Sequence, residues 1–109
     1  MPEQTVLEVL KAARALIADP ERWTQAAFAR TEQGKVVKPW SPSASCWCAT
    51  GALWKVVGAT EERLFADAKD ALYFGTYQRH IAEANDDNDH AYIIRRFDKA
   101  IARLEQTNA

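Results

Sequence analysis

The sequence predicts a mainly α fold, a compact bundle of about five helices around a central apolar helix, with one small β-hairpin. Three observations favour this fold. Apolar residues recur every three or four positions near both ends of the chain. Residues 46–57 carry almost no charge, and such a helix is buried on several sides. The stretch at about residues 26–38 combines short apolar runs with a glycine-containing turn, which is typical of a hairpin. From the length of the chain we expect one helical domain over residues 1–109.

The first helix has clear signals at both ends. Thr5 and Glu8 fit a capping box, in which each side chain accepts from the backbone N–H of the other residue. Asp19-Pro20 ends the helix, because proline disfavours helical geometry in the residue before it. One apolar stripe runs between these signals: Val6, Leu10, Ala13 and Ile17.

A hairpin and a loop follow the first helix. Two short apolar stretches flank a polar turn, so residues 26–38 are expected to form the hairpin with Gly34 at a positive φ. Pro39 to Ser43 is expected to be loop, since it contains two prolines. Trp40 in this loop must either bury itself or mark a contact surface.

The central helix is expected to cover about residues 46–57. Ser45 is its predicted N-cap and Gly58 its predicted C-cap. Gly51 lies among small residues and is expected where another element crosses the helix closely. On this helix Cys46 and Cys48 would point about 200° apart, which rules out an ordinary disulfide between them. We therefore expect free thiols in a reducing compartment.

Three further helices are expected after Gly58. The third begins at about residues 60–62, and a short fourth helix spans about residues 77–84. Asn85 to Asp89 is a polar connection, and Asp89 is its best candidate to cap the last helix, which begins at about His90. The apolar stripes of the third and last helices are Leu64, Phe65, Ala68, Ala71 and Leu72, and Ile94, Phe97, Ile101 and Leu104.

Charge and hydropathy exclude some classes of function. The chain has 14 basic and 15 acidic residues and a net charge of −1, so its field does not favour nucleic acid or an anionic membrane. No apolar run approaches the roughly 20 residues that span a bilayer, and the N-terminus lacks the basic start of a signal peptide. The protein is expected to be cytoplasmic, with no nucleic-acid or membrane partner.

Four segments of the chain resemble a family of small bacterial and phage proteins of unknown function. They are Asp19 to Gln25, Trp47 to Leu53, Ile81 to Asp86 and Phe97 to Ile101. The family is marked by a Trp-Cys-Ala-x-Gly-Ala-Leu helix and a later Trp-Asn-Asp, but Ala84 stands where the family has tryptophan, which weakens the case for an aromatic site beside Asn85. The resemblance implies no activity. The residues that match the family's motifs, for which we expect structural roles, are Trp47, Cys48, Gly51, Asn85 and Asp86.

Cys48 is the strongest candidate for chemistry. Near the start of a helix, the unpaired N–H groups favour a thiolate. With His80 or His90 as base and Asn85 or Asp86 as orienter, Cys48 would complete a triad of the thiol-hydrolase type. The alternative is that Cys48 packs as a small buried hydrophobe, in which case serine there would be worse tolerated than alanine. We favour this structural reading.

Metal sites and cofactors are not expected. A zinc site built from Cys46, Cys48, His80 and His90 would need ligands that a C-x-C helix splays apart. The acidic run from Asn85 to Asp89 lacks the glycine and distal glutamate of a calcium loop, so helix capping explains it better.

The function expected from these observations is that of a non-enzymatic protein-binding module, such as a regulator or inhibitor associated with a phage or mobile element. Its partner would be another protein or a second copy of the chain. The alternative is a small thiol-dependent hydrolase or transferase using Cys48. The chain is rich in large aromatic side chains, and tryptophan and tyrosine are enriched at interfaces. Those that flank the core elements are the predicted binding residues: Trp40, Trp54, Tyr73 and Tyr77.

Overall fold

A computed structural model describes residues 5–73, 85 and 89–107. The described residues form four α-helices, where about five were expected for the whole chain, and a short 3-10 helix, η1 at Pro20–Arg22. The helix expected at about residues 77–84 lies outside the described residues. No helix in the described part is long and apolar enough to cross a membrane. The four are α1 at Val6–Leu16, α2 at Ala49–Val57, α3 at Glu62–Tyr73 and α5 at His90–Thr107.

The capping box of α1 is confirmed. The Thr5 N–H donates to Glu8 Oε1 at 2.9 Å, and the Glu8 N–H donates to Thr5 Oγ1 at 3.1 Å. The bond from the Thr5 N–H also holds the pKa of Glu8 below its ordinary value, because it stabilises the carboxylate. Pro20 starts η1, with Asp19 Oδ1 accepting from the Glu21 N–H at 2.9 Å.

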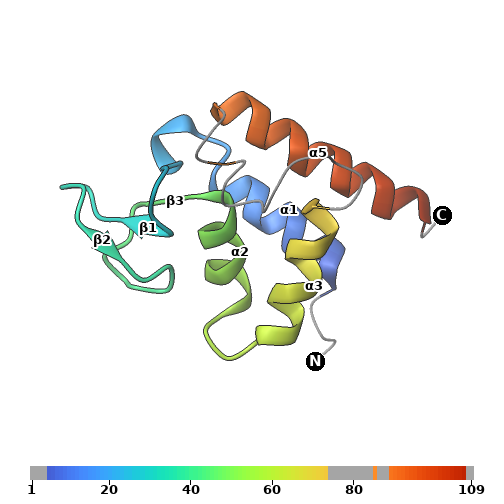
Figure 1. Cartoon of the computed structure of the whole chain (residues 1–109), viewed down its shortest axis with the longest axis horizontal. Helices are drawn as coiled ribbons and strands as arrows, with labels where there is room; N and C mark the ends of the chain where they lie inside the picture. Colours follow the sequence, from blue (N-terminus) through green and yellow to red (C-terminus); the bar gives the residue numbers. More distant parts are fainter. Residues whose placement is uncertain (1–4, 74–84, 86–88, 108–109) are drawn as a thin grey trace.

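Helix α1 lies at the centre of the helical layer and contacts α2, α3 and α5 (Figure 1). Three of the four residues of its predicted stripe, Leu10, Ala13 and Ile17, are fully buried, and so is Val9. Phe97 and Ile93 of α5 are equally buried on the other side of the interface. The predicted cap of α5 is confirmed too, because Asp89 Oδ1 accepts from the Tyr92 N–H at 2.9 Å.

The strands form a three-stranded antiparallel sheet at the other end of the molecule (Figure 1). The order is β2-β1-β3, with β1 at Ala29–Arg30, β2 at Val36–Val37 and β3 at Cys46–Trp47. Strands β1 and β2 are the predicted hairpin, and Gly34 has the expected positive φ of 87°. The third strand was not predicted, since its two residues were assigned to the central helix.

Helix α2 therefore begins later than the sequence indicates. Its N-cap is Cys48 rather than Ser45, and Cys46 and Trp47 pair with Arg30 and Ala29 instead of joining the helix. Ser45 belongs to the same ladder, because its N–H donates to the Arg30 carbonyl at 2.8 Å. A tertiary pairing with β1 thus overrides the local helix signal. Neither cysteine forms a disulfide, and the two lie on different elements instead of on one helix.

Gly51 lies where the backbone of residue 28 crosses α2, which confirms the expected close approach. A Cβ atom on Gly51 would lie 1.9 Å from the Phe28 carbonyl oxygen. That same oxygen accepts a hydrogen bond from the Cys48 N–H at 3.2 Å. Since the obstacle is backbone held in place by the sheet, it cannot move aside as a flexible side chain would.

Gly51→Ala is therefore expected to destabilise the protein by about 1–3 kcal/mol, through overpacking. Alanine in place of glycine at an exposed helix position would instead stabilise by up to about 1 kcal/mol, so the sign of the change is diagnostic. Urea unfolding of the two proteins measures it. Ala12→Gly on the exposed side of α1 is the control for helix propensity alone. A higher unfolding midpoint for Gly51→Ala would contradict the close crossing.

Candidate functional site

Asn85 is the most connected polar side chain among the described residues, and it is fully buried. Its Oδ1 accepts from the Trp23 indole N–H at 2.6 Å and from the Ala49 N–H at 2.9 Å. Its Nδ2 donates to the Thr24 carbonyl at 3.0 Å, and its own carbonyl accepts from Gln25 Nε2 at 3.0 Å. Asn85 thus joins residues 23–25 to the start of α2, which supports the structural role expected for it.

Cys48 is the N-cap residue of the same helix, α2. Its Sγ accepts from the Gly51 N–H at 3.2 Å, and the residue is only 4% exposed. The thiol thus satisfies one of the N–H groups that a helix N-terminus leaves without an intrahelical partner. Its surroundings are those of a capping group within the scaffold rather than of an open nucleophile.

The other members of the proposed triad also have structural contacts. Nε2 of His90 lies 2.7 Å from the Ile17 carbonyl, and the ring packs edge-on against Trp23 with 5.7 Å between centroids. His80 and Asp86 lie outside the described residues. Within the part of the chain that is described, no three His, Cys, Asp or Glu residues gather as metal ligands would.

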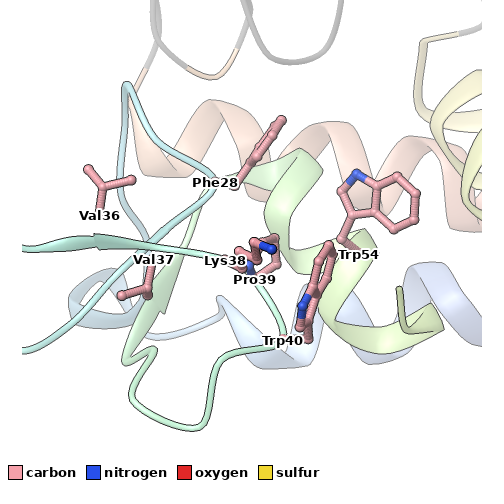
Figure 2. A pocket seen from close by; sticks show the side chains of 7 residues that line it. All are labelled: Phe28, Val36, Val37, Lys38, Pro39, Trp40 and Trp54. Atoms are coloured by element: carbon pink, nitrogen blue, oxygen red, sulfur yellow. The ribbon is translucent and has the colours of Figure 1, made fainter. Parts of the chain in front are cut away.

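An apolar groove lies between the hairpin and Trp54 of α2 (Figure 2). Its volume is about 620 Å³. The large hydrophobic side chains that stay exposed in the described chain all line it: Phe28 at 48%, Val36 at 59% and Trp40 at 40%. The remaining lining comes from Val37, Lys38, Pro39 and Trp54.

Trp40 and Trp54 form the aromatic wall of the groove, and contacts with neighbouring residues hold this wall in place. Trp40 meets Trp54 edge-on, with ring centroids 6.0 Å apart at an angle of 76°. Trp54 in turn stacks on Phe65 of α3 at 3.7 Å and 12°. The indole N–H of Trp47 donates to the carbonyl of Pro39, next to Trp40 in the chain, at 2.9 Å and fixes the loop. The wall is therefore built before any ligand arrives.

The structure brings together two of the four predicted binding residues, Trp40 and Trp54. Tyr77 and the side chain of Tyr73 lie outside what the structure describes. Phe28 and Val36 were not predicted as binding residues, because both belong to the hairpin stretch and periodicity alone does not show which face of so short a sheet is covered. Strand alternation in residues 28–30 was the available signal, since it places Phe28 on the face opposite the buried Ala29.

The capping role of Cys48 reverses the order of tolerance expected for a buried hydrophobe. Cys48→Ala should cost about 1 kcal/mol, because the Gly51 N–H loses its acceptor. Cys48→Ser should cost less, since the serine hydroxyl is a good N-cap and keeps the bond. Thermal unfolding of the three proteins decides the order. Greater stability of the alanine variant would mean that the thiol acts only as an apolar filler, and rapid alkylation of Cys48 in the folded protein would mean that it is an accessible nucleophile.

Comparison with known proteins supports a family assignment over almost the whole chain. No curated protein and no solved structure matches the chain. Residues 1–103 match the profile of a family of unknown function, DUF6197. The buried contacts of Asn85, Cys48 and Gly51 and the groove beside them are thus features of a chain that belongs to the family of unknown function DUF6197.

Proposed function

We propose that this protein is a non-enzymatic binding module that docks a partner protein in the groove between the hairpin and Trp54. The observation that carries the proposal is the gathering of the exposed Phe28, Val36 and Trp40 on one groove. Scattered exposed hydrophobic residues need no explanation, whereas a contiguous apolar patch in a soluble domain marks an interaction site. A module of this kind regulates or inhibits its partner by covering part of the partner's surface.

The construction of the groove supports binding at low entropic cost. Trp40 lies in a loop between Pro39 and Pro42, where the backbone has little freedom to lose. Its ring already rests against Trp54, which is itself stacked on Phe65. Aromatic anchors that are fixed in this way dominate the energy of many protein interfaces.

The alternative, a thiol-dependent hydrolase or transferase using Cys48, has weaker support. Its nucleophile is buried and its sulfur accepts from the Gly51 N–H. Its orienter, Asn85, is fully buried, and Oδ1 of Asn85 accepts two N–H groups of the scaffold. The groove itself is lined by apolar side chains and one lysine, and Cys48 is not among the residues that line it.

Trp40→Ala is expected to weaken binding of the partner about 30-fold, which corresponds to about 2 kcal/mol, because the anchor ring is removed. The wild-type chain and the variants serve as bait in lysate of the source organism, and proteins retained by the wild type are quantified by mass spectrometry. The affinity of each recovered protein is then measured by titration.

Two controls make the comparison specific. Trp40→Phe keeps an aromatic ring and should retain most of the affinity, and Arg95→Ala changes an exposed side chain on α5, outside the groove. Equal affinity of Trp40→Ala for every recovered protein would contradict the proposal. Loss of cooperative unfolding in that variant would show that Trp40 is a lid on the core instead of a binding residue.

A further inference from the structure

The outer edge of β2 offers backbone groups for pairing. β2 is an edge strand of the sheet: it pairs with β1 on one side, and within the described chain no strand pairs with its other side. The Thr31 N–H donates to the Lys35 carbonyl at 2.9 Å, so the backbone carbonyl of Lys35 points toward the strand that contains β1. Antiparallel bonds alternate along a strand, and Val36 therefore points its N–H and C=O away from β1. Its side chain is 59% exposed as well.

We propose that the partner docks by adding an extended segment to the outer edge of β2, and that this segment carries acidic side chains beside Lys35 and Lys38. This inference rests on the proposed binding function and specifies its mode. In strand addition, main-chain hydrogen bonds supply affinity, and alternate side chains of the added strand supply specificity. The Val36 N–H and C=O supply the main-chain part here.

The groove supplies the side-chain part. In the register of the hairpin, Ala29 is opposite Val37 and Arg30 is opposite Val36. The residues on the other face of the two strands are therefore Phe28, Arg30, Val36 and Lys38. Figure 2 shows the side chains of Val36 and Val37 on opposite sides of the strand, with Trp40 and Trp54 farther along the groove. Every second side chain of an added strand would lie beside Val36 and Lys38 and reach this apolar lining.

Charge identifies the chemistry of the added segment. Lys35 and Lys38 flank the two valines of β2, and neither forms an ion pair with another described residue. Among the described residues that line the groove, Lys38 is also the sole ionisable one. A carboxylate placed opposite or diagonal to each lysine gains a favourable cross-strand pair, whereas a basic segment is repelled.

The same charges disfavour a second copy of this chain as the occupant. Pairing two β2 strands would bring four lysines, Lys35 and Lys38 of each copy, onto one short ladder. Like charges on adjacent strands are destabilising, and edge lysines are a common means of preventing such pairing between copies. The occupant is therefore a different protein with an acidic, extended segment.

Selection from a displayed library of random octapeptides on the wild-type protein tests the mode of binding. The enriched peptides should alternate apolar and polar positions and contain at least one Asp or Glu near an apolar residue. The double variant Lys35→Glu, Lys38→Glu should lose at least tenfold in affinity for these peptides, because the charge pairs become repulsive. Enrichment of basic peptides, or of apolar residues at helical spacing, would overturn the proposal.

The substitution Val36→Pro tests the backbone bond itself. Proline removes the outward N–H without removing a bond to β1, and proline is tolerated on edge strands. We expect at least tenfold weaker peptide binding for Val36→Pro and less than a threefold change for Val36→Thr, which keeps the N–H and the branched side chain. Hydrogen exchange of the wild type gives an independent measurement, in which the Val36 amide should become protected when peptide binds.

Failure of this inference differs from failure of the binding function. If Trp40→Ala abolishes peptide binding but Val36→Pro does not, or if the Val36 amide stays unprotected, the groove binds without strand addition and the inference is wrong. If binding survives Trp40→Ala, or if the library yields no binder, the groove is not the docking site and both proposals are wrong.

Discussion

The buried carboxamide of Asn85 is the constraint on which the rest of the described structure depends. A buried polar group without a partner costs about 1–3 kcal/mol, so a fully buried amide is tolerated only where its hydrogen bonds are satisfied. Here the amide also satisfies others, since it accepts from Trp23 and Ala49 and donates to Thr24. One side chain thereby fixes the segment before the sheet and the first turn of α2 relative to each other.

The position of the groove follows from this fixed helix end. With Ala49 held by Asn85, the Cys48 N–H meets the Phe28 carbonyl, and the missing side chain of Gly51 leaves room for that carbonyl. The close crossing brings the hairpin against α2, so that the side chain of Phe28 and that of Trp54 line the same groove. A buried polar contact and one glycine thus position an exposed aromatic surface.

Local signals predicted the helices well, whereas contacts between distant segments decided what the sequence could not. The capping box of Thr5 and Glu8, the positive φ of Gly34 and the cap at Asp89 are each encoded within a few residues, and all are confirmed. Strand β3 exists because Cys46 and Trp47 meet β1, about 16 residues earlier in the chain, and no local pattern reveals such pairing. Trp40 and Trp54 were identified as candidates from the sequence. The groove that joins them to Phe28 was not predicted, because it also depends on contacts between distant segments.

The most direct test of this account is the free energy of unfolding of Asn85→Ala, measured by urea denaturation against the wild type. The variant leaves the Trp23 indole, the Ala49 N–H and the Thr24 carbonyl without their buried partner. We predict a loss of about 3–5 kcal/mol, or failure to fold cooperatively. A loss below about 1 kcal/mol would be the effect of an ordinary surface substitution and would contradict the central role of Asn85.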